Sequence, residues 1–377
     1  MVVGPAADVV IVGGGVAGGV LALALRELSA SVTVVDAPAQ DAVQASSRTQ
    51  VCSASALSYG ALPGWPLAPT PLARMAAGAS KHWRRLQGRH GALGWRPCRL
   101  RVHGAAAGLR AVSAWWPLPF AQVDSAVLMA RLPLILAAAG VTCRSARVEQ
   151  LNREPTAGWM LHLSDDTSLR APQLVLAAGA HCRHLWPALP SRLRSSWAAA
   201  LELPSYPAVL GSASAWLPLS FGRVGLERRA ASLSQPEWLV DGGLVPWAAG
   251  ALLGQHTLVR PGLELGAPPP PVEVERQLRQ GLEAQSWGAS LAALPGGLRQ
   301  AAVSFCSQGV PLVGALPEAP GLWVFTGFSA GFSQVPVLAP LVAQALVSGG
   351  SRAEAALRRL HQLGLGQPNL AGADRCP

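Results

Sequence analysis

Three glycines near the N-terminus have the types and the spacing that bind a phosphate. Gly13, Gly15 and Gly18 fit the pattern GxGxxG within the stretch "VVIVGGGVAGGVLALALRELSASVTVVD", residues 9–36. In such a turn the first glycine permits a tight bend, the second lets the backbone approach a pyrophosphate, and the third lets a helix pack closely on a strand. The turn therefore predicts a phosphate-binding site.

Asp36 supplies the second part of the pattern. It lies eighteen residues beyond Gly18, where a carboxylate accepts hydrogen bonds from the ribose of an adenosine. Val16 and Ala17 begin the helix after the turn, and the start of a helix offers free N–H groups and a partial positive charge to phosphates. Together these residues predict binding of the ADP half of a dinucleotide. They leave open whether that dinucleotide is FAD or a nicotinamide cofactor.

Three elements must hold these residues in place. The sequence predicts a buried strand over residues 8–12, a helix over 16–28 and a second strand over 31–36, which together form a βαβ unit. A continuous apolar run at 172–180 predicts a central strand covered on both faces. Residues 336–350 predict a helix that ends at a pair of glycines.

The length and the texture of the chain indicate more than one domain. With 377 residues the chain is long for a single core, so we expect two domains, interleaved along the sequence. Residues 190–295 are rich in proline and tryptophan and favour short strands. The last third returns to the pattern of the first, which indicates that the two ends of the chain share a domain.

The net charge of +10 is concentrated in one segment. Residues 42–123 contain no acidic residue. The ten basic residues there are Arg48, Arg74, Lys81, Arg84, Arg85, Arg89, Arg96, Arg99, Arg101 and Arg110. Two interpretations stay open: a solvated helix face followed by a basic loop, or a patch that attracts an anionic substrate, a nucleic acid or a membrane surface.

Cysteine spacing and hydropathy exclude several classes. The six cysteines are scattered without a CxxC pair, so the sequence predicts neither a disulfide framework nor a metal site. No apolar run approaches the ~20 residues of a membrane span, and the apolar N-terminus has no basic leader. We therefore expect a cytoplasmic protein without a transmembrane segment.

Four further segments carry motifs that occur in the same order in one known family. They read "ASSRTQVCS" (45–53), "ARVEQL" (146–151), "LVLAAGAHCRHLWP" (174–187) and "GLRQAAVSFCSQGVPLVGALPEAPGLWVFTGFSAGFSQVPVLAP" (297–340). In order and spacing they resemble the D-amino-acid oxidase and glycine oxidase family of FAD-dependent oxidoreductases. The resemblance extends over essentially the whole chain, and it implies that the dinucleotide is FAD.

The resemblance also implies where the rest of the cofactor lies. It places Ser46, Ser47 and Arg48 against the flavin side of the pyrophosphate. It places the backbone of Val148 against the adenine.

The remaining cofactor contacts come from two turns. Ala178 and Gly179 would lie near the cofactor at the end of an apolar strand. In the second turn the residues implied are Gly327, Phe328, Gly331, Phe332 and Ser333. By the family's chemistry, the N–H groups of this second turn and the dipole of the helix after it would face N1 and the C2 carbonyl of the flavin and favour the reduced anion.

Arg299 matches the arginine that grips the carboxylate of an amino acid in this family. A guanidinium offers two parallel donors to a carboxylate and fixes the orientation of the substrate. The alternative is an arginine held in a structural salt bridge, and the sequence does not decide between the two.

The chain departs from the family pattern at several positions. Gln308 stands where the family usually has an aspartate, and the only tyrosines are Tyr59 and Tyr206. The only lysine, Lys81, falls in the basic segment, so we do not expect a lysine near the flavin that would promote its reaction with oxygen. Oxidase and dehydrogenase both stay open. Cys306 does not match the flavin-attachment cysteine of sarcosine oxidase relatives, so we expect a buried, inert thiol.

These observations combine into one expectation of fold and function. We expect an α/β fold in which a Rossmann-like FAD-binding domain is interleaved with a smaller antiparallel-sheet α+β substrate domain. The expected boundaries are 1–78, 122–192 and 296–370 for the FAD-binding domain, 79–121 and 193–295 for the substrate domain, and 371–377 for a tail.

The expected reaction is oxidation of a C–N bond of a small amine or amino acid by hydride transfer to the flavin. One alternative is a tRNA-modifying FAD oxidoreductase acting on an aminomethyl-uridine, with nucleic acid as the less favoured partner. The other is a catalytically degenerate flavoprotein that serves as a binding module. The substrate, the electron acceptor and the oligomeric state stay open.

Overall fold

The computed structural model describes residues 7–38, 49–104, 112–154, 158–285 and 287–366. Buried β-branched residues at the start of the chain build the middle of a six-stranded sheet, in the order β20-β21-β13-β1-β2-β9. Its strands are β1 (Val9–Val12), β2 (Val32–Asp36), β9 (Thr142–Ser145), β13 (Gln173–Leu176), β20 (Leu312–Ala315) and β21 (Leu322–Thr326). All neighbours are parallel except β20, which runs antiparallel to β21.

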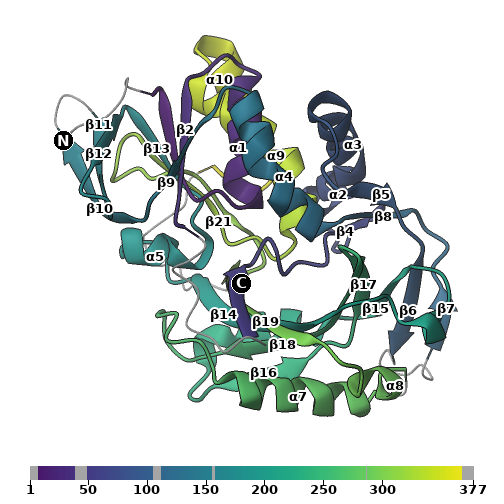
Figure 1. Cartoon of the computed structure of the whole chain (residues 1–377). Helices are drawn as coiled ribbons and strands as arrows, with labels where there is room; N and C mark the ends of the chain where they lie inside the picture. Colours follow the sequence, from purple (N-terminus) through teal and green to yellow (C-terminus); the bar gives the residue numbers. More distant parts are fainter. Residues whose placement is uncertain (1–6, 39–48, 105–111, 155–157, 286, 367–377) are drawn as a thin grey trace.

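Helices cover one face of this sheet (Figure 1). They are α1 (Val16–Arg26), α4 (Ser125–Ala138), α9 (Gly331–Val347) and α10 (Gly350–Gln362). Alternate strand residues such as Val9, Ile11 and Val34 point into this layer, as the period of two requires. The βαβ unit expected at the N-terminus is confirmed by β1, α1 and β2.

The other face of the six-stranded sheet packs on a small antiparallel sheet. Val10, Val12 and Leu176 point to this side and share a core with Trp159 and Leu161. The small sheet is formed by β10 (Val148–Glu154), β11 (Gly158–Leu163) and β12 (Ser168–Ala171). The middle of this sheet is thus covered on both faces, which explains why an inner strand such as β1 is a continuous apolar run.

A nine-stranded, mostly antiparallel sheet forms the second half of the molecule, in the lower part of Figure 1. Its strands are β3 (Thr49–Ser53), β6 (Leu100–Gly104), β7 (Val112–Trp115), β14 (Leu193–Leu203), β15 (Ala215–Pro218), β16 (Glu237–Val240), β17 (Leu244–Trp247), β18 (Gly250–Val259) and β19 (Gly297–Cys306). Helices α7 (Pro271–Glu283) and α8 (Ala289–Ala292) pack on one face, against Ala199 and Leu201. The residues that alternate with them along β14, Ala198 and Ala200, point to the opposite face.

Short elements connect the two halves. A three-stranded sheet is formed by β4 (Ala61–Pro63), β5 (Trp95–Pro97) and β8 (Phe120–Val123), and the short helices are α2 (Pro71–Ala76), α3 (Ala79–His90), α5 (Cys182–Leu185) and α6 (Gly222–Arg229). Single 3₁₀ turns lie at Gly179–His181, Ala208–Leu210 and Ala230–Ser232. Within the described residues, no helix is both long and apolar enough to cross a membrane.

Three segments lie in a different half from the one that the expected boundaries give them. Strands β3 and β19 belong to the nine-stranded sheet, although the expected boundaries place both in the cofactor-binding domain. Helix α3 is expected in the substrate domain, yet Ala79 and Trp83 are buried in the core of the six-stranded sheet. Pairing of β3 with β19, and the contact of Trp83 in α3 with Phe332 in α9, join residues 249 positions apart and decide these placements, which local composition does not record.

Candidate active site

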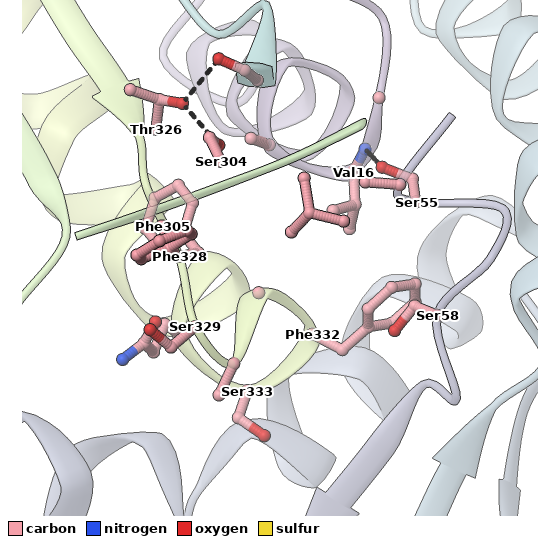
Figure 2. A pocket seen from close by; sticks show the side chains of 18 of the residues that line it. Val16, Ser55, Ser58, Ser304, Phe305, Thr326, Phe328, Ser329, Phe332 and Ser333 are labelled. Carbon is pink, nitrogen blue, oxygen red and sulfur yellow. Dashed lines mark hydrogen bonds between the residues drawn. The ribbon is translucent and has the colours of Figure 1, made fainter. Parts of the chain in front are cut away.

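A cavity of about 2000 Å³ is lined by residues of both large sheets. The six-stranded sheet contributes the carboxyl ends of β1, β2, β13 and β21, and the nine-stranded sheet contributes residues of β14 and β19. Ligand sites in open parallel sheets lie at this carboxyl edge. Figure 2 shows the region of the cavity between Val16 and Ser55 on one side and Phe328 and Ser333 on the other.

The glycine turn between β1 and α1 forms one wall. Gly13, Gly15, Val16 and Ala17 line the cavity. Gly13 has a φ of 109°, and a Cβ placed there would lie 2.5 Å from the carbonyl oxygen of Ala177. Gly15 is the N-cap of α1 and has no side chain that could cap the helix, so the first N–H groups other than that of Val16, which donates to Ser55, are suited to an anion.

Gly18 lies behind the wall and does not line the cavity. A Cβ at this position would overlap the carbonyl oxygen of Gly13 and approach Cγ2 of Ile11 to 3.1 Å. The third glycine therefore allows α1 to lie against β1, as the sequence pattern predicts.

Ser55 is a cavity residue that the sequence analysis missed. Its hydroxyl accepts a hydrogen bond from the N–H of Val16 at 2.9 Å (Figure 2). Residues 50–59 lead from β3 along the cavity, next to the segment in which Ser46, Ser47 and Arg48 were expected to bind the pyrophosphate. Those three residues lie outside the described part of the chain. The run of small residues "SASALS" after β3 was the signal that could have indicated a close approach.

Asp36 lines the cavity at the end of β2. Its carboxylate accepts hydrogen bonds from the backbone N–H groups of Gly14 and Ala37, and a Cβ at Gly14 would lie 2.8 Å from its Oδ2. Although the cavity leaves Asp36 accessible to solvent, the surrounding protein raises its pKa above the ordinary value by desolvation. Arg147 and Val148 line the same end. This end therefore has the acceptor that a ribose needs.

The turn between β21 and α9 forms the opposite wall. Phe328, Gly331, Phe332 and Ser333 line the cavity, whereas Gly327 lies behind it with a φ of 77°. Helix α9 begins at Gly331, five residues before the expected start, and no side chain caps it. Its first turn thus presents the positive end of a helix dipole to the cavity.

A hydroxyl network joins this turn to the apolar strand expected at 172–180. The hydroxyls of Ser304 and Thr326 lie 3.2 Å apart, as Figure 2 shows, and Thr326 donates to the carbonyl of Gly179 at 3.4 Å. Ala178 and Gly179 both line the cavity. Strand β13 itself ends at Leu176, earlier than expected, because the chain enters a 3₁₀ turn at Gly179.

Arg299 does not line the cavity in this structure. On β19 it lies opposite Gln50 in the parallel register and diagonal to Glu202 of β14. Its guanidinium donates to both side chains, and it lies 5.3 Å above the ring of Trp247. The ion pair with Glu202 corresponds to the structural alternative that the sequence left open.

The thiol of Cys306 lines the cavity near Gly327, where a Cβ would lie 2.6 Å from its sulfur. Burial raises the pKa of this thiol to about 11. Because the thiolate is the reactive form, Cys306 is a poor nucleophile near neutral pH.

Several cations of the acid-free segment 42–123 have partners, and their carboxylate partners lie outside the segment. Arg85 and Arg89 pair with Glu27, and Arg96 pairs with Asp124. Arg99 lies 3.9 Å above the ring of Trp115. Several of these charges are therefore engaged within the protein, and they do not form a uniformly free basic face. Arg48 and Arg110 lie outside the described residues.

Comparison with protein families gives one match. A family model described as FAD dependent oxidoreductase matches residues 8–345. A sequence comparison with curated proteins gives no significant match.

Solved structures share the fold. Glycine oxidase from Geobacillus kaustophilus superposes with a TM-score of 0.65 at 18% identity, covering 90% of this chain and 94% of that chain. L-Amino acid deaminase from Proteus myxofaciens, solved in complex with anthranilate, gives 0.65 at 13% identity, covering 92% and 91%. L-Proline dehydrogenase from P. horikoshii gives 0.63 at 12% identity, covering 93% and 95%. The expected α/β fold class is confirmed.

Proposed function

The chain belongs to the family of FAD-dependent oxidoreductases, and we propose that it oxidises the C–N bond of an amino acid or a small amine. FAD is the cofactor of this family, as the sequence predicts. The solved structures that share the fold include an oxidase, a deaminase and a dehydrogenase named for amino acids. A C–N bond beside a carbon that can lose hydride is the feature common to such substrates.

The volume of the cavity and the residues that line it support a bound FAD. Drug-sized ligands occupy about 300–1000 Å³, so a cavity of about 2000 Å³ has room for a dinucleotide and a substrate. The glycine turn at Gly13 and Gly15 suits the pyrophosphate, and Asp36 suits the ribose. Ala178 and Gly179, which also line the cavity, would contact the cofactor near the pyrophosphate turn and Asp36.

The chemistry that the flavin supplies is acceptance of a hydride from the carbon beside the amine. The protein would orient the substrate and stabilise negative charge. Phe328, Gly331, Phe332 and Ser333 surround the start of α9, whose dipole favours an anion there. The single observation that carries the proposal is that the glycine turn and the start of α9 line one continuous cavity.

Anaerobic mixing with a panel of amino acids and amines tests the proposal. At least one compound should bleach the visible absorption of the bound flavin, and re-oxidation should return it. A flavin that dithionite reduces but that no compound in the panel bleaches would contradict the proposed reaction.

Replacing Asp36 with alanine is expected to weaken FAD binding about tenfold to a hundredfold, because hydrogen bonds to a charged group contribute about 1.5–3 kcal/mol. Titration of the apoprotein with FAD measures the affinity. Asp165→Ala is the control, since Asp165 lies on the exposed hairpin between β11 and β12. Equal FAD affinities for the two variants would remove Asp36 from the ribose site.

A further inference from the structure

Two oppositely charged side chains of α6 line the cavity and were not singled out in the sequence. Arg223 and Glu227 are one helical turn apart, and Nη1 of Arg223 donates to Oε1 of Glu227 at 3.0 Å. The Glu227 side chain is 5% exposed and that of Arg223 is 21% exposed. The pair is therefore nearly closed off from bulk solvent, with the cavity on its open side.

The pair is bonded to the turn that precedes α9. Nη2 of Arg223 donates to the carbonyl oxygen of Ser329 at 2.9 Å, and the hydroxyl of Ser329 forms a hydrogen bond with the Glu227 carboxylate. Ser329 follows Phe328 on the cavity wall, as Figure 2 shows. The charged pair thus lies at the end of the cavity that the proposed function gives to the flavin ring.

The start of α6 is held in a fixed position by Asp241. Its carboxylate accepts hydrogen bonds from the N–H groups of Gly222 at 2.6 Å and of Arg223 at 2.9 Å. These bonds fix the backbone from which the Arg223 side chain extends to the cavity. This is the kind of support that an orienting group needs.

Stability does not explain why this pair is buried. An exposed pair at this helical spacing stabilises a protein only slightly, whereas removing two charges from water carries a much larger desolvation cost. The same helix ends with an exposed pair, Arg229 with Glu237, which incurs no such cost. A buried charge pair in a cleft is therefore a candidate for a functional role.

Both partners keep hydrogen-bonding capacity beyond the bonds already described. After its bonds to Glu227 and Ser329, the Arg223 guanidinium still has N–H groups without a partner among the described residues, and its Nε is one of them. A carboxylate can also accept more bonds than Arg223 and Ser329 provide. Arg299, by contrast, is occupied by Glu202 and Gln50 outside the cavity lining.

We propose that the Arg223–Glu227 pair binds the zwitterion of an α-amino acid, with Arg223 anchoring the carboxylate and Glu227 taking a proton from the ammonium group. This inference rests on the proposed function and gives it a substrate class, since a simple amine could use only half of the pair. In the proton transfer an N–H bond of the ammonium breaks and an O–H bond forms on Glu227. The amine then has the lone pair that loss of hydride from the adjacent carbon requires.

The surroundings of Glu227 suit a proton acceptor. Burial raises its pKa above the ordinary value, Asp241 acts in the same direction, and Arg223 and Ser329 oppose them. A raised pKa brings a carboxyl group closer to the working pH, where general bases are most effective.

The other charged or titratable groups on the elements around α6 are mostly engaged elsewhere. Glu237 of β16 pairs with Arg229, His256 of β18 is bonded to Gln277, and Arg299 of β19 pairs with Glu202. Cys306 of β19 is a protonated thiol. Arg228 of α6 also lines the cavity.

The carboxylate half is tested with benzoate, a carboxylate with no amine to oxidise, titrated against the visible spectrum of bound flavin. Arg223→Gln should weaken benzoate binding about tenfold or more, and Arg223→Lys should restore part of it. Arg229→Gln, on the same helix but exposed and outside the cavity lining, is the matched control. Wild-type benzoate affinity in Arg223→Gln, or a loss seen only in Arg299→Leu, would overturn the assignment.

The proton half is tested by the pH profile of anaerobic flavin reduction. Wild-type protein should lose its reduction rate as pH falls and Glu227 becomes protonated, because a neutral acid cannot take the proton. Glu227→Gln should be slower by about 10²–10⁴ near neutral pH and recover as pH rises toward the pKa of the substrate ammonium. Glu237→Gln is the matched control.

Glu227→Gln with a wild-type pH profile would overturn the proton transfer.

Arg223→Gln should also lose the preference of the wild-type protein for an amino acid over the amine that lacks its carboxylate. An unchanged preference would overturn the zwitterion site. FAD content and thermal unfolding of each variant separate these outcomes from misfolding. Wild-type protein that neither an amino acid nor an amine bleaches contradicts the proposed function. Bleaching by amines alone, or bleaching by amino acids with indifferent variants, contradicts only this inference.

Discussion

Valine in place of Gly18 is expected to abolish FAD binding. Any Cβ at this position overlaps the carbonyl oxygen of Gly13 and crowds Ile11 of β1. Helix α1 would have to move away from the strand, and overpacking of this kind costs about 1–3 kcal/mol or more. The glycine turn would move with the helix, because the same overlap involves its first residue. The flavin content of the purified variant and its affinity for added FAD measure the effect.

Gly88→Val is the matched control for this experiment. Gly88 is also in a helix, α3, and a Cβ there meets nothing within 4 Å. The control should retain flavin and a nearly unchanged free energy of unfolding. A Gly18→Val protein that binds FAD as tightly as the control would mean that the close approach of α1 and β1 does not shape the phosphate site.

Alanine in place of Trp83 is expected to lower the free energy of unfolding by about 3–5 kcal/mol, the usual cost of truncating a buried aromatic residue. Trp83 of α3 is fully buried, and its Nε1–H donates to the carbonyl oxygen of Phe332 at 2.7 Å. That carbonyl lacks its helical partner because the residue four positions later, Pro336, has no N–H. Trp83 therefore supplies the missing donor in the first turn of α9.

Trp83→Phe separates the hydrogen bond from the packing. It should cost about 1–3 kcal/mol, because the Phe332 carbonyl is left without a partner, and it should also reduce flavin affinity through the displaced turn. Denaturant unfolding and FAD titration measure the two effects. Trp238→Ala, which removes a 43% exposed tryptophan, is the control. If Trp83→Phe matched wild type in both measurements, Trp83 would not support the start of α9.

The elements that the sequence predicts best are those that depend on nearby residues. The turn at Gly13, the helix after it and the acid at Asp36 lie within one βαβ unit, where period, glycines and spacing are all local. Pro336 is typical of a helix start, so the sequence predicts a start five residues later than the one observed. Inside α9, Trp83 of a distant helix donates to the carbonyl that Pro336 leaves without its helical partner.

The residues that the sequence does not reveal depend on pairing between distant strands. Arg299 meets Glu202 because β14 and β19 are neighbours, and it meets Gln50 because β3 pairs with β19 across 249 residues of the chain. The segment 42–123 contains no acid, yet Glu27 and Asp124 reach its arginines in space. Arg223 and Glu227 carry no sequence motif, and only the cavity gives them significance.

The visible spectrum of the purified protein tests whether one cavity holds the ADP half of FAD at the β1–α1 turn and the flavin ring at the start of α9. We expect a yellow protein with flavin in a stoichiometric amount, released as FAD on denaturation and absent from Gly18→Val. A colourless wild-type protein that takes up no added FAD would contradict it.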